Sequence, residues 1–162
     1  MDPLGLIHMI FGLVALVAGA AVMLMRKGTR WHRTLGHVYL TTMVGLNGTG
    51  LFIYDLFGAF GPFHWMALAS LATLAVGRVA VLARRPRANW LTVHAGFMAG
   101  SYVGLVAAAA SEVTTRLPGN PASFSPAVTA ITSLVVIVVG ASWLMRTLSQ
   151  MVARVSEPRR VR

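Results

Sequence analysis

Four histidines recur at nearly even intervals along the chain. They are His8, His37, His64 and His94, and the intervals between them are 29, 27 and 30 residues. In successive antiparallel helices this spacing places His8 opposite His64 at one end of a bundle, and His37 opposite His94 at the other. A b-type haem takes two neutral imidazoles on opposite faces of a flat apolar ring. The pattern therefore predicts two haem-binding pairs that pass electrons across a membrane to and from unidentified redox partners.

Two arginines suit the same interpretation. Arg26 and Arg78 are predicted at the end of the bundle that holds His37 and His94. A guanidinium group forms bidentate hydrogen bonds with carboxylates. We therefore expect Arg26 or Arg78 to bind the haem propionates.

The opposite end of the bundle offers an alternative site. One ionisable residue from each of the first four predicted helices forms an outer polar layer, which consists of His8, Asp55, His64 and Glu112. Two histidines and two carboxylates are a ligand set for zinc or iron. With an open coordination position, such a metal would activate water. The alternative function is a metal-dependent enzyme at the outer face.

A third interpretation needs no cofactor. Polar side chains near helix ends extend their charged groups to the membrane surface. All of these histidines, arginines and carboxylates would then anchor helices in a non-catalytic scaffold or accessory subunit. The sequence leaves open whether the protein is an enzyme.

The predicted helix that carries His37 organises the others. His37 and Asp55 bound a stretch with no other ionisable side chain. Eighteen residues make five turns, so both groups are expected on one helix face, about 27 Å apart. That distance approaches the roughly 30 Å thickness of a bilayer core.

Composition indicates a membrane protein. The chain has 162 residues, of which 56% are hydrophobic and 11% charged, and its net charge is +10. The basic residues lie in short clusters between long apolar runs, which argues against nucleic-acid binding and favours contact with membrane lipid. There is no cysteine, so neither disulfides nor thiolate ligands are available.

Five apolar segments are long enough to span a bilayer. Each approaches or exceeds the roughly 20 residues that a spanning helix needs. They cover about residues 4–25, 35–57, 64–83, 91–111 and 127–145. Short loops between them predict an all-α, up-and-down bundle of five transmembrane helices. It forms a single transmembrane domain over residues 1–146, and a basic cytoplasmic tail follows over residues 147–162.

The distribution of lysine and arginine predicts the orientation. Nearly all of them lie on one side of the predicted bundle, in the connections after the first and third segments and after the fifth. Positively charged connections stay in the cytoplasm. The N-terminus is therefore expected outside and the C-terminus in the cytoplasm, in a multi-pass protein of the plasma (inner) membrane.

Small residues mark expected packing faces. They recur at intervals of four or seven residues, as Gly5, Gly12 and Gly19 in the first segment and Gly96, Gly100 and Gly104 in the fourth. Such stripes let helices approach closely, within one chain or in a homo-oligomer. Asn47, which lies among glycines, is predicted to form an interhelical hydrogen bond.

Two stretches resemble a known family. Residues 27–39 read as KGxxxHRxxGxxY and residues 94–102 as HxxxMxxSY. Together with His8 and Gly12, they resemble the bacterial family of predicted membrane proteins called domain of unknown function 2306. The resemblance covers roughly the first four segments and implies a small multi-helix membrane fold with no established activity. It emphasises the motif residues His32, Arg33, Gly36, Ser101 and Tyr102. The alternation of histidines is also similar to that in the two-haem transmembrane cytochromes b.

Overall fold

Helices are the regular secondary structure of the part of the chain that the structure describes. The computed structural model describes residues 2–54 and 58–116, together with 131, 134–135, 138–142 and 145–146. Its helices are α1 (Pro3–Leu24), α2 (Arg30–Gly50), α3 (Pro62–Ala83) and α4 (Trp90–Arg116), and no strand occurs among these residues. The chain forms two compact units, Met1–Arg78 and Val79–Arg162.

Three described helices are long and apolar enough to cross a membrane: Pro3–Leu24, Phe63–Ala83 and Trp90–Val113. They confirm three of the five predicted spans by length and composition. The segment predicted over 35–57 is helical in its first part, but α2 is not among the three. The fifth, over 127–145, lies largely outside the described residues. The orientation stays a prediction.

The end of α2 differs from the prediction. The helix begins at Arg30, where the Thr29 hydroxyl caps it by accepting a hydrogen bond from the backbone N–H of His32 at 3.1 Å. It ends at Gly50, and residues 51–54 are not helical. The expected helix to residue 57 is therefore wrong, and so is the single helical face shared with Asp55, which itself lies outside the described residues. Glycine is a poor helix former, and three glycines among the last six residues of α2 weaken this end.

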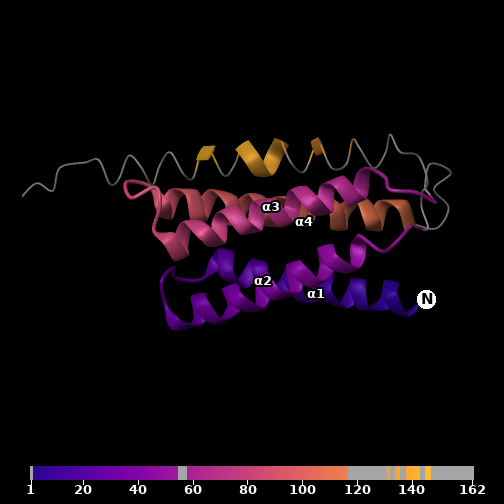
Figure 1. Ribbon diagram of the computed structural model, residues 1–162, viewed down its shortest axis with the longest axis horizontal. Coiled ribbons are helices and arrows are strands. Elements are labelled where there is room, and N and C mark those ends of the chain that lie inside the picture. The colour runs from indigo at the N-terminus through magenta and orange to yellow at the C-terminus, as the bar shows by residue number, and fades with distance from the viewer. Residues whose placement is uncertain are drawn as a thin grey trace, which may run out of the picture. The chain divides into compact units, whose positions relative to one another are not determined.

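Helices α1 and α2 lie side by side and antiparallel (Figure 1). A Cβ atom added to Gly12 would lie 3.5 Å from a methyl group of Leu46, and one added to Gly45 would lie 2.7–2.8 Å from the ring of Phe11. Gly19 is buried as well, whereas Gly5 has no neighbour within 4 Å. The predicted small-residue face of the first helix is thus confirmed at two of its three glycines.

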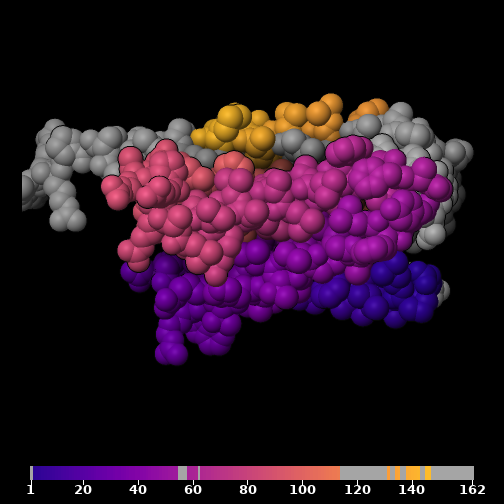
Figure 2. All heavy atoms as spheres, viewed as in Figure 1, coloured from indigo at the N-terminus to yellow at the C-terminus, as the bar shows by residue number. Residues whose placement is uncertain are grey.

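The outward side of α1 is apolar. Val17 and Leu24 are 72% and 88% exposed, and Leu13 is more than half exposed. These side chains belong to the helix that is indigo in the space-filling view (Figure 2). A surface of this kind is unfavourable in water and suits contact with lipid chains.

Close packing in the second unit involves a different glycine from those predicted. A Cβ atom on Gly140 would lie 2.5 Å from the side chain of Val103 in α4. A Cβ atom added to Gly100 or Gly104 would have no neighbour within 4 Å in the part of the chain that is described. The described residues therefore show no close contact at these two positions of the predicted stripe.

Candidate functional site

Helix α2 is joined to its neighbours by polar contacts at three levels. In the first unit, His8 of α1 contacts Thr49 of α2, and Asn47 of α2 contacts Ser70 of α3. At the other end of α2, a third contact joins it to Arg78 of α3. We call the end where α1 begins the His8 end, and the opposite end the Arg78 end.

The contact of His8 orients its imidazole ring. The Thr49 hydroxyl donates its hydrogen to the backbone carbonyl of Gly45 at 2.8 Å, so its oxygen accepts from Nδ1–H of His8 at 3.0 Å. When the imidazole is neutral, this arrangement makes Nε2 the basic nitrogen. A Cβ atom added to Gly50 would lie 3.3 Å from Cε1 of His8. Glycine at position 50 therefore leaves room for the imidazole ring. Histidines that ligate metals are oriented in the same way, by a hydrogen bond from the other ring nitrogen.

His64 is buried at the start of α3 and is only 3% exposed. Its Nδ1 atom accepts a hydrogen bond from the backbone N–H of Gly61 at 3.0 Å. The Nε2 atom is buried and has no hydrogen-bond partner. The rings of Tyr54 and Phe60 lie against the imidazole, with centroids 4.6 and 4.7 Å away. A buried polar atom without a partner costs about 1–3 kcal/mol, so the free nitrogen of His64 is a candidate ligand atom.

His37 is exposed and held from both sides. Its Nδ1–H donates to the carbonyl of Arg33 at 2.7 Å, and its Nε2 accepts from Nη2 of Arg78 at 3.3 Å. The imidazole is therefore neutral in this arrangement, and the guanidinium group occupies the nitrogen that haem iron would need. The pairing of His37 with His94, which belongs to the second unit, stays a prediction.

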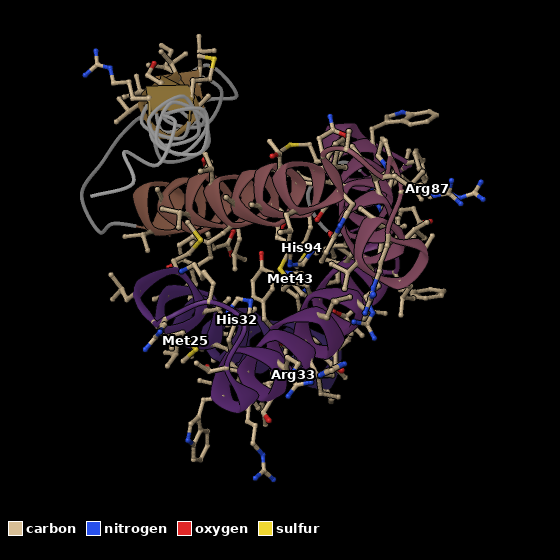
Figure 3. All side chains as sticks on the ribbon, turned by 90° about the vertical axis from the view of Figure 1, so that its left-hand side faces the viewer. Met25, His32, Arg33, Met43, Arg87 and His94 are labelled. Carbon is tan, nitrogen blue, oxygen red and sulfur yellow. The ribbon has the colours of Figure 1, made fainter. Side chains whose placement is uncertain are left out.

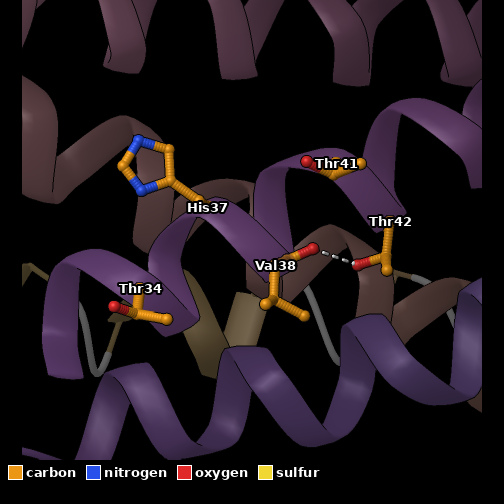
Figure 4. A pocket seen from close by; sticks show the side chains of 5 residues that line it. All are labelled: Thr34, His37, Val38, Thr41 and Thr42. Atoms are coloured by element: carbon orange, nitrogen blue, oxygen red, sulfur yellow. Dashed lines mark hydrogen bonds between the residues drawn. The ribbon is translucent and has the colours of Figure 1, made fainter.

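An open hollow of about 460 Å³ lies beside His37 on the surface of α2. Its lining residues are Thr34, His37, Val38, Thr41 and Thr42 (Figure 4). The hydroxyl hydrogens of Thr34 and Thr42 are donated to the carbonyls of Arg30 and Val38, at 3.1 and 2.8 Å. These two side chains therefore offer only acceptor atoms to the hollow.

Other predicted residues lie in the connection before α2 and in its first turns. Arg26 is exposed in that connection, and Arg33 is exposed on α2. His32 is half-buried, while Met43 further along α2 is buried (Figure 3). Gly36 has no neighbour within 4 Å.

Lys27 is a residue whose role the sequence did not indicate. Its ammonium group donates to the carbonyls of Val22, Met23 and Met25 at 2.9, 2.6 and 3.0 Å, and so caps the end of α1. Burial lowers the pKa of Lys27. The three carbonyl oxygens act in the opposite direction because they bind the charged form.

The remaining predicted residues belong to α4 in the second unit. His94 and Tyr102 are half-buried, and Glu112 is exposed. Ser101 is buried, and its hydroxyl donates to the carbonyl of Met98 at 2.8 Å. That bond ties the hydroxyl to its own helix, as is usual for serine in an apolar helix.

The predicted metal cluster receives no support from the described residues. Among residues 2–54, 58–116 and the short described pieces beyond, no group of three or more histidine, cysteine, aspartate or glutamate side chains could hold a metal ion. Asp55, one of the four expected ligands, lies outside them. The zinc or iron site stays a prediction.

Sequence reasoning found one of the three polar contacts of α2. The predicted interhelical role of Asn47 is confirmed, because its Nδ2 donates to Ser70 at 3.1 Å and to the carbonyl of Met43 at 2.7 Å. It missed Thr49 as the partner of His8. The sequence did contain a signal for this contact, because Thr49 places a hydroxyl group next to glycines of α2, where another helix can approach closely.

Comparison with known proteins agrees with the helical membrane architecture. Neither the curated proteins nor the solved structures gave a match. The family model described as "Predicted membrane protein (DUF2306)" matches residues 5–152. With most of its length matched, and with three helices able to span a bilayer, the chain is a membrane protein that belongs to the family with domain of unknown function 2306.

Proposed function

We propose that this membrane protein binds a b-type haem at the His8 end, where His8 and His64 would hold the iron, and that it transfers electrons. The observation that carries the proposal is the buried Nε2 atom of His64, which lacks a hydrogen-bond partner. Two neutral imidazoles are the ligands that such a haem needs. The haem supplies a one-electron redox couple.

The surroundings of both histidines suit a flat apolar ring. Nδ1–H of His8 is bonded to Thr49, which leaves Nε2 basic. The partners of His64 are the aromatic rings of Tyr54 and Phe60, which exclude water. Both histidines contact residues at the end of α2 or just after it, so they belong to the same end of the first unit.

Ligation by His64 requires one local change. Its Nδ1 now accepts from the N–H of Gly61, so the proton of the neutral ring is on Nε2. For Nε2 to bind iron, that proton must move to Nδ1, and the bond from Gly61 must be released. We expect the loop before α3 to rearrange when haem binds.

A second haem between His37 and His94 is a further prediction with weaker support. Arg78 donates to Nε2 of His37 and would have to leave it. The expected stoichiometry is therefore one haem per chain.

Spectroscopy of the detergent-purified protein, produced with a haem supply, tests the proposal. A Soret band that shifts on reduction with dithionite is expected, together with one haem per chain by pyridine haemochrome. His8→Ala and His64→Ala should each abolish the six-coordinate spectrum, whereas His37→Ala should keep it. A colourless protein after haem reconstitution, or unchanged spectra in both His8→Ala and His64→Ala, would contradict the proposal and leave the scaffold interpretation.

A further inference from the structure

The Arg78 end carries positive charge that no described carboxylate balances. The chain has only four acidic residues. In the described part of the first unit the one acidic residue is Asp2, which caps the opposite end of the unit by accepting from the N–H of Gly5. Arg78 lies inside a helix long and apolar enough to span a membrane, five residues before its end. A guanidinium group at that depth is costly unless it has a polar or anionic partner.

Arg78 is oriented but not neutralised by its contact with His37. One guanidinium N–H group donates to Nε2 of His37, and His37 is itself fixed by the carbonyl of Arg33. An imidazole in this state is a neutral acceptor. The guanidinium group has five N–H groups in a planar fork that fits phosphate oxygens.

The hollow beside this contact supplies one further hydroxyl group that could donate to an anion, that of Thr41. Thr41 is exposed, and its hydroxyl lines the hollow with the imidazole of His37 (Figure 4). Val38, which is exposed, gives the hollow an apolar side. Hydroxyl and guanidinium groups beside an exposed valine match a phosphate that carries hydrocarbon chains.

We propose that Arg78, together with the Thr41 hydroxyl in the hollow beside His37, binds the phosphate of an anionic phospholipid from the leaflet at that end of the bundle. A lipid is favoured over free phosphate because the hollow is open and one of its lining residues is the exposed, apolar Val38. Exposed Trp31, at 72%, lies at the same end of α2, and tryptophan favours the membrane interface. The proposal does not depend on haem.

Lipid retention in nanodiscs tests this site. The full chain is placed in phosphatidylcholine nanodiscs with a small fraction of phosphatidylglycerol, and the bound phosphatidylglycerol is measured by native mass spectrometry. Arg78→Lys keeps the charge but loses the planar fork. The matched control is Arg87→Lys, at an exposed position in the connection before α4. We expect Arg78→Lys to lower retention about 2–10-fold, the factor for one lost hydrogen bond, because the planar fork is lost, and Arg87→Lys to leave retention unchanged.

Two further arms separate the sources of the anion and guard against misfolding. Thr41 is exposed, and Thr41→Val removes its hydroxyl group without changing the charge. This variant should also retain less phosphatidylglycerol, while its helical circular dichroism stays the same. Inorganic phosphate should not displace the lipid. Equal retention in Arg78→Lys and Arg87→Lys would overturn the proposal, as would displacement by inorganic phosphate. It would also be overturned if Arg78→Lys left lipid binding intact but weakened haem absorbance, because Arg78 would then serve a propionate.

Discussion

Replacing Gly45 with alanine tests the contact between α1 and α2. The added Cβ atom would lie 2.7 Å from Cζ and 2.8 Å from both Cε atoms of Phe11. Carbon atoms pack at about 3.5–4.0 Å, so the ring or the helices must move by about 1 Å. Overpacking of this kind costs about 1–3 kcal/mol.

Gly48→Ala is the matched control for this prediction. Gly48 lies on the same helix, and a Cβ atom there has no neighbour within 4 Å. Both changes raise helix propensity by about 0.8–1 kcal/mol, so this contribution cancels in the comparison. The free energy of unfolding of Gly45→Ala should therefore be about 1–3 kcal/mol lower than that of Gly48→Ala.

Unfolding in mixed micelles with increasing sodium dodecyl sulfate, followed by circular dichroism, measures the difference. If Phe11 is the obstacle, the cost of Gly45→Ala should largely vanish in a Phe11→Ala background. Equal stability of Gly45→Ala and Gly48→Ala would refute the α1–α2 packing described above. If Gly45→Ala still lowers the free energy of unfolding by the same amount in the Phe11→Ala background, the Phe11 ring is not the cause.

Three further changes test individual contacts. Thr49→Val removes the acceptor of His8 Nδ1–H, so haem affinity, titrated optically, should fall about 10–100-fold; unchanged affinity would separate Thr49 from the site. Asn47→Leu removes the bond to Ser70 and should lower the free energy of unfolding by about 0.6–1.7 kcal/mol; no loss in the same detergent titration would mean that the bond contributes nothing. Gly140→Ala meets a valine of α4 and should cost about 1–3 kcal/mol, and a neutral result would contradict that packing.

Much of the helical layout is readable from composition. α1, α3 and α4 begin and end within a few residues of the predicted segments, because continuous apolar runs of that length have no alternative to helix in a bilayer. The exception is the end of α2. There the residues up to position 57 are still apolar apart from Asp55, so hydropathy alone extended the predicted helix beyond Gly50, where the glycine-rich end of α2 lies.

The contacts of the candidate site were harder to predict. His8 with Thr49, and His37 with Arg78, each join residues 41 positions apart on neighbouring helices. Periodicity gives the face of a helix but not its rotation against a neighbour, so periodicity did not identify Thr49 as the partner of His8. The backbone N–H of Gly61 bonds to Nδ1 of His64 and so determines that Nε2 is the nitrogen without a partner. Every residue except proline has such an N–H group, so nothing in the sequence indicated this contact.

The polarity of α2 has a consequence for how the protein reaches its final state. α2 is a 21-residue helix, yet it lacks the hydropathy of its neighbours and packs closely on α1. A helix of this kind partitions poorly from the translocon on its own. We expect α2 to insert as a helical hairpin with α1, so that a chain synthesised without residues 1–24 leaves α2 outside the bilayer and open to protease.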